Sequence, residues 1–82
     1  MLGVTPMAAR LQLYALEERN RLARHAEYLQ TALQIATDEG LEALTMARLA
    51  AEVDAAVGTV YTNFPSQGAL VAEVQREAVD RP

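Results

Sequence analysis

Apolar residues in this chain recur three or four positions apart, which is the spacing that places side chains on one face of an α-helix. The clearest stripe consists of Leu22, Ala26, Leu29, Leu33 and Ala36, with Ala32 beside it. We expect a helix here that buries this stripe. No segment shows the alternation of a strand or the pattern of a hairpin, and no internal repeat is present. The sequence therefore predicts an all-α fold.

Glycine and threonine mark the ends of the next elements. The stripe is followed by Asp38-Glu39-Gly40, and Gly40 can adopt the left-handed conformation that closes a helix without a side-chain penalty. After a short connection over residues 41–44, Thr45 is a candidate N-cap, because its hydroxyl can accept a hydrogen bond from a backbone N–H. A second helix of about two turns is expected to follow. Its apolar edge is Leu49, Ala50 and Val53.

A third and a fourth helix are predicted after the short segment 54–56. The apolar set of the third helix, which we expect to face inward, is Val57, Val60 and Phe64. Pro65 disfavours helical geometry at Phe64, so the third helix is expected to end there. Ser66 can cap the fourth helix. The apolar residues of that helix are Leu70, Val71 and Val74.

An extra helix is predicted at the N-terminus. Pro6 favours a helix start, because proline at the first helical position gives up only an N–H that has no partner. The residues that could continue the first stripe are Leu11, Tyr14 and Leu22. Polar residues 17–21 interrupt this continuation, and whether the extra helix fuses with the next one is left open. We treat residues 1–20 as an N-terminal helical extension and residues 21–82 as the main domain.

Length and composition limit the function. A chain of 82 residues has room for one small domain. It has no cysteine and one histidine, His25, which we expect to be solvated near the N-terminal arginines; neither a disulfide nor a metal or cofactor site is predicted. The longest uncharged stretch, residues 55–72, is interrupted by Pro65 and Gly68, and residues 1–9 lack the features of a secretory signal. We expect a cytoplasmic protein with no membrane partner.

Charge is unevenly distributed around a net value of −4. Residues 1–25 carry four arginines and two glutamates, a net charge of +2, whereas residues 26–82 carry three arginines and nine acidic residues, a net charge of −6. The N-terminal arginines are Arg10, Arg19, Arg21 and Arg24. They form either a solvated helix face paired with Glu17 and Glu18 or a basic arm.

The predicted third helix has an unusual surface. Gly58 lies one step into this helix, where glycine costs about 1 kcal/mol relative to alanine, so the position needs close backbone approach, an unusual φ/ψ or a functional reason. Thr59, Thr62 and Asn63 are expected to share an outward face that is polar, uncharged and short. A second short helix and a tight turn precede it, as in a helix-turn-helix that enters a DNA major groove. Tyr61 should be half-buried, with its hydroxyl in solvent or at a phosphate.

A longer pattern connects these positions. The motif G-T-x-Y-x-x-F occupies residues 58–64, between Leu49-Ala50 and Ser66. Further matching positions are Tyr28-Leu29, Ala32, Gly40, Leu44-Thr45, Asn63 and Leu70. With these residues the chain resembles, from about residue 27 to 74, the N-terminal DNA-binding domain of TetR-family transcriptional regulators. The resemblance implies a three-helix bundle with a helix-turn-helix at about residues 44–63 and the start of a fourth, linker helix.

The resemblance also implies roles for individual residues. By position, Thr45 and Arg48 look like phosphate contacts from the second helix. The positions that face bases or the groove wall are Ala56, Val57, Gly58, Thr59 and Thr62. Tyr61 and Asn63 match positions that touch the DNA backbone, and Gln67 lies where the family usually has a lysine. These ten residues are the predicted DNA-binding site.

Three positions depart from the family pattern. Gln67 removes a charged phosphate contact, Ala56 replaces a usual serine, and Asp54 replaces a usual glycine in the turn. Residues 44–64 contain one arginine against Glu52 and Asp54, a net charge of −1. Because neutralisation of phosphates by Lys and Arg supplies most non-specific affinity, we expect a monomeric head to bind DNA weakly. Backbone N–H groups at helix N-termini and the N-terminal arginines are the remaining sources of attraction.

The first functional hypothesis is sequence-specific DNA binding by the head of a bacterial transcriptional regulator. The resemblance implies a repressor that acts as a homodimer on double-stranded DNA with a pseudo-palindromic operator. In this family a larger C-terminal domain provides dimerisation and effector binding, and we expect that domain to be absent from this chain.

The alternative hypothesis is a helical protein-interaction module with a helix-turn-helix that no longer binds DNA. Its N-terminal helix would pair with a partner through Leu11, Leu13, Tyr14 and Leu16. An enzyme is not predicted, because the one serine lacks a glycine elbow, no carboxylate pair has catalytic spacing, and no phosphate-binding loop is present.

Overall fold

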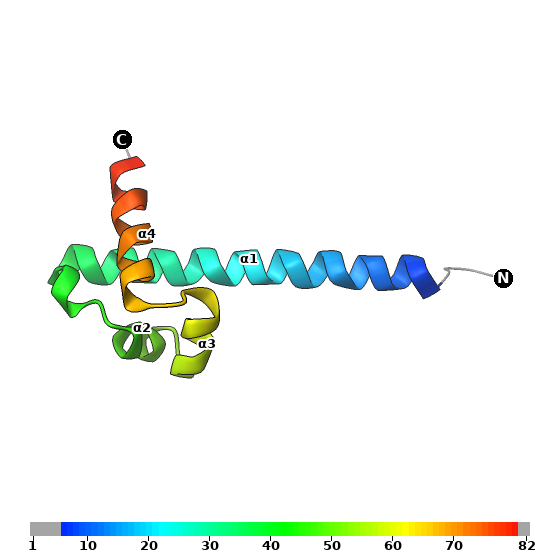
Figure 1. Ribbon diagram of the computed structural model, residues 1–82, viewed down its shortest axis with the longest axis horizontal. Helices are drawn as coiled ribbons and strands as arrows, with labels where there is room; N and C mark the ends of the chain where they lie inside the picture. Colours follow the sequence, from blue (N-terminus) through cyan, green and yellow to red (C-terminus); the bar gives the residue numbers. More distant parts are fainter. Residues whose placement is uncertain (1–5, 81–82) are drawn as a thin grey trace.

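The computed structural model describes residues 6–80 of the chain. Its elements are α1 (Pro6–Glu39), a short 3₁₀ turn η1 (Leu41–Ala43), α2 (Met46–Glu52), α3 (Val57–Asn63) and α4 (Gln67–Asp80) (Figure 1). Between residues 6 and 80 there is no strand, so the predicted all-α fold is confirmed.

The N-terminal helix and the first helix of the head are one continuous element. α1 is helical from Pro6, the first described residue, and passes through the polar segment 17–21 without a break. This segment consists mostly of Glu and Arg, which have good helix propensity. Within it the Arg21 guanidinium pairs with the Glu18 carboxylate three residues earlier. The extra helix is therefore not separate from α1, and residues 1–5 of the predicted extension lie outside the described residues.

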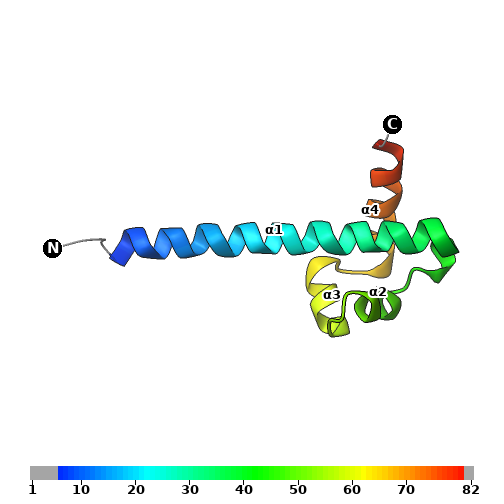
Figure 2. The same cartoon turned by 180° about the vertical axis from the view of Figure 1, so that it is seen from behind.

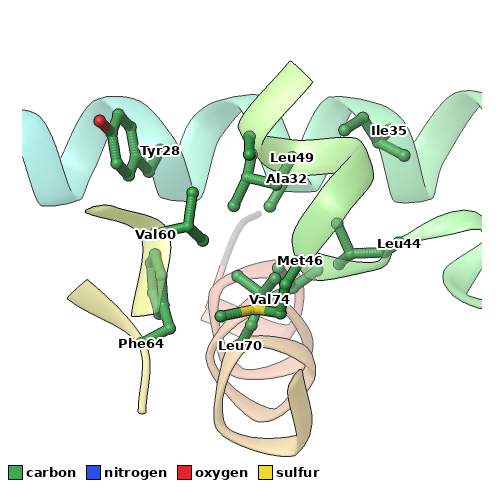
Figure 3. Close-up of a cluster of buried hydrophobic side chains, with 11 residues drawn as sticks. Tyr28, Ala32, Ile35, Leu44, Met46, Leu49, Val60, Phe64, Leu70 and Val74 are labelled. Atoms are coloured by element: carbon green, nitrogen blue, oxygen red, sulfur yellow. The ribbon is translucent and has the colours of Figure 1, made fainter. Parts of the chain in front are cut away.

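The C-terminal half of α1 carries the head. α2 and α3 lie along one side of this half, and α4 crosses it at a steep angle (Figure 1). The core contains side chains from all four α-helices and the connection between η1 and α2 (Figure 3). Its buried members are Tyr28, Ala32, Ile35, Leu44, Met46, Leu49, Ala50, Val60, Phe64, Leu70 and Val74.

The predicted stripe on α1 is displaced from the face that is actually buried. Leu22 is 56% exposed, and Leu29, Leu33 and Ala36 are only partly buried. The buried face consists of Tyr28, Ala32 and Ile35. The two stripes are neighbours on the helix, and spacing alone gives the period of a helix but not which of two adjacent faces the other helices cover.

The ends of the short helices follow the predicted capping residues. The Thr45 hydroxyl accepts from the Arg48 N–H at 3.0 Å, and the Ser66 hydroxyl accepts from the Ala69 N–H at 3.1 Å. Phe64 has φ −133° and ψ 111°, the extended conformation expected before proline. Gly40 has a positive φ of 96°, but its ψ of 158° lies outside the left-handed helical region that we predicted.

The N-terminal half of α1 projects away from the head (Figure 2). Every residue from 10 to 24 is exposed. The radius of gyration is 16.6 Å, whereas a compact chain of this length would have about 12 Å. We call residues 10–24 the arm.

Candidate nucleic-acid interface

α2 and α3 are two seven-residue helices that pack on each other and share the core. The turn between them places Asp54 at φ +56°, in the left-handed region. Glycine adopts this region at no steric cost, and aspartate is one of the few other residues that tolerate it. This geometry explains why Asp54 can occupy a turn position at which the family resemblance implies a glycine.

α3 presents a broad exposed surface. Val60 and the adjoining Phe64 point into the core, whereas the exposed residues of the helix are Val57, Gly58, Thr59, Tyr61 and Thr62. The inward orientation predicted for Val57 is wrong, because its side chain is 45% exposed. α3 begins on the side of the head remote from α1 and rises towards it (Figure 1).

Gly58 is the second residue of α3 and is exposed. A Cβ at this position would find no heavy atom within 4 Å, so no neighbouring helix packs against it. The backbone is helical, without a positive φ. Neither close packing nor a positive φ therefore accounts for this glycine among the described residues.

The polar side chains of α3 partly bond to their own helix. The Thr62 hydroxyl donates to the Gly58 carbonyl at 3.0 Å, and Asn63 Nδ2 donates to the Thr59 carbonyl at 3.1 Å. Asn63 is half-buried at the end of the helix, whereas Thr59 and Thr62 are exposed as predicted. Tyr61 is 49% exposed, in agreement with a half-buried ring. The helix therefore displays hydroxyl groups, one valine and a bare stretch of backbone, with no formal charge.

Comparison with known protein families matches residues 29–74, more than half of the chain, to the tetR family of bacterial regulatory proteins. The chain belongs to the TetR family. Comparison with curated proteins and with solved structures finds no match. The TetR-type head is a DNA-binding domain of transcriptional regulators and not an enzyme, as the sequence predicted.

Arg48 is the only basic residue between residues 44 and 63 of this TetR-type head. Its guanidinium binds Glu39, the last residue of α1, through both carboxylate oxygens at 2.8 and 2.7 Å. It also donates to Glu52, the last residue of α2, from Nε at 3.2 Å and from Nη2 at 3.0 Å. The hydrogen bonds from Arg48 hold the pKa of the Glu39 carboxyl below its usual range, and those carboxylates raise the pKa of Arg48. We call these three residues the Arg48 clamp.

The other predicted contacts lie around α3. Thr45 is half-buried at the start of α2, and its cap bond leaves the hydroxyl proton available to donate outward. Ala56 precedes α3 and makes no side-chain cap, as the loss of the usual serine implies. Gln67 is exposed at the first position of α4.

The expectation that His25 is solvated is wrong. Instead of being solvated, its ring is half-buried and lies 4.4 Å from the Phe64 ring, centroid to centroid. Its Nε2 lies 3.1 Å from the Glu73 carboxylate, which connects α1 to α4. Sequence reasoning also missed the clamp: the four-residue spacing of Arg48 and Glu52 was a usable signal, but the contact to Glu39 depends on tertiary packing.

No helix between residues 6 and 80 is long and apolar enough to cross a membrane. In the same part of the chain, no group of three His, Asp or Glu side chains could hold a metal ion.

Proposed function

We propose that this TetR-type head binds double-stranded DNA sequence-specifically as part of a cytoplasmic bacterial repressor. The observation that carries the proposal is the uncharged, exposed surface of α3, where no contact among the described residues accounts for Gly58. A helix with small outward side chains can enter the major groove, with its N-terminal residues at the base edges.

The side chains divide by chemistry into those that read bases and those that hold the backbone. Val57 can contact a thymine methyl, and the Thr59 and Thr62 hydroxyls can bond to base edges. Phosphate contacts are assigned to Arg48, to the Tyr61 hydroxyl and to the polar groups of Thr45, Asn63 and Gln67. Ala56 and Gly58 are assigned to close approach at the groove wall.

Because we expect one head to bind DNA weakly, we propose that two heads bind together. Residues 44–64 carry a net charge of −1, so one head neutralises few phosphates. Two heads on a two-fold operator, with half-sites about 34–36 Å apart, would gain affinity from simultaneous binding. The assignment of dimerisation to a further C-terminal domain rests on what is usual in the family.

Selection from a randomised duplex pool tests this function, using the chain alone and the chain fused to a dimerising coiled coil. We expect retained duplexes to share a motif, with two-fold symmetry in the dimer. The variant T59A/Y61A should lose the motif. T37A is the control, since it removes an exposed threonine side chain from α1, outside the predicted DNA-binding site. Absence of any motif with both proteins, or a motif unaffected by T59A/Y61A, would refute the proposal.

The exposed arm favours a second candidate function, association of two copies through their arms. Leu11 and Tyr14 are each 61% exposed, and Leu13 and Leu16 are at least half exposed. The arm makes no tertiary contact among the described residues that would stabilise its helix, so a partner helix would do so. Light scattering of the full chain should then show dimers. The variant L11Q/L13Q/L16Q should be monomeric, whereas V79Q, which changes an exposed apolar residue of α4, should still form dimers. A monomer at all concentrations would exclude this function.

A further inference from the structure

Arg48 is the natural phosphate contact of this head by position, yet its hydrogen-bonding capacity is almost fully used within the chain. A guanidinium has five N–H donors. Four hydrogen bonds run from Arg48 to Glu39 and Glu52, all between 2.7 and 3.2 Å. A bidentate phosphate contact uses a planar pair of N–H groups, and both such pairs of Arg48 already bind the carboxylates of Glu39 and Glu52.

The position of the clamp makes this occupation durable in the free protein. Glu39 ends α1, the helix on which the core is built, and Glu52 ends α2. The Arg48 backbone is itself fixed by the Thr45 cap. The two acceptor carboxylates therefore come from the ends of two packed helices, and the fold keeps them beside Arg48.

The clamp is nevertheless open to competition from solvent. The side chains of Arg48, Glu39 and Glu52 are 35%, 45% and 44% exposed. Exposed ion pairs are weak and are screened by salt, so a dense row of phosphates can compete for the guanidinium.

We propose that Glu39 and Glu52 act as a built-in brake on DNA binding, by occupying Arg48 and keeping it from phosphate until the groove contacts of α3 have formed. The inference rests on the DNA-binding function proposed above and adds a regulatory element to it. Generic contact with the DNA backbone is weakened, whereas a correct operator supplies the contacts that offset loss of the clamp. The two carboxylates therefore raise the ratio of specific to non-specific binding.

The test measures the affinity of the full chain for a labelled random-sequence duplex by fluorescence anisotropy, between 50 and 200 mM salt. The variant E39Q/E52Q releases Arg48 and should add about one phosphate contact. The affinity loss over this salt range should then become about threefold larger than in the wild type. E27Q/E42Q is the matched control, because it removes two exposed carboxylates that do not bind Arg48. The triple variant E39Q/E52Q/R48Q should lose the gain.

The outcomes are separable. The brake is supported when only E39Q/E52Q steepens the salt dependence and R48Q cancels the effect. It is overturned when E27Q/E42Q gives the same change, when the effect survives R48Q, or when E39Q/E52Q gives no gain, including no binding by any variant. Circular dichroism of each variant confirms folding. Because the probe has random sequence, a failure to select an operator motif would refute sequence specificity and leave this result standing.

Discussion

Replacing Gly58 with alanine separates the stability of α3 from its contact with DNA. Gly58 is the second residue of α3, is exposed, and offers empty space where a Cβ would lie. Alanine there creates no clash and restricts the unfolded chain, so the free energy of unfolding should rise by about 0.5–1 kcal/mol. For a domain of this size the melting temperature should rise by about 2–8 °C.

The same methyl group should weaken DNA binding. If the α3 backbone approaches the groove at Gly58, an added methyl overpacks the interface at a cost of about 1–3 kcal/mol, or roughly 5- to 150-fold in Kd. Thermal unfolding followed by circular dichroism gives the stability, and anisotropy on a selected duplex gives the affinity. Gly68 supplies the control, since it is the second residue of α4 and a Cβ there would lie 3.8 Å from Ser66 Oγ, an ordinary contact.

Both G58A and G68A should therefore raise the melting temperature, and only G58A should weaken binding. A lower melting temperature for G58A would contradict the empty space around a Cβ at residue 58. A higher melting temperature with unchanged affinity would mean that glycine is not needed for DNA approach, and the assigned groove surface would be wrong.

Three further substitutions test the fold and the clamp. G40A should lower the free energy of unfolding by about 1–2 kcal/mol in urea titration, because φ 96° and ψ 158° belong to a region used almost only by glycine. The new Cβ would also lie 2.6 Å from the Glu42 carboxylate, and the double variant G40A/E42A removes this clash but should not restore stability. T45A removes the α2 cap and should cost about 1 kcal/mol by thermal unfolding, and an unchanged melting temperature would contradict the cap. Because the Arg48 hydrogen bonds lower the pKa of the Glu39 carboxyl, its ionised form stabilises the folded chain at pH values above the ordinary pKa near 4.3, and this stability is lost as the pH falls through the lowered pKa. Acid titration should therefore destabilise the wild type more than E39Q. Parallel unfolding curves for the two proteins would contradict the ion pair.

The local order of the chain was readable from its sequence because each signal acts within a few residues. Thr45 and Ser66 cap their helices, and Phe64 is extended before Pro65. These effects depend on backbone geometry and on hydrogen bonds of short sequence separation, so no tertiary contact was needed to predict them. The family motif over residues 58–64 likewise depends on fixed spacing, and the family match confirms it.

Tertiary packing decided which of the possible faces and partners the chain uses. Helical spacing could not distinguish the buried Ala32 face of α1 from the adjacent Leu22 face, because the choice depends on where α2 and α4 cross. Val57 has the spacing of a core residue, but at the start of α3 its side chain is 45% exposed. Arg48 meets Glu39 only because α2 packs against the end of α1. Contacts between residues on different helices depend on the relative placement of whole elements, which periodicity within one element does not contain.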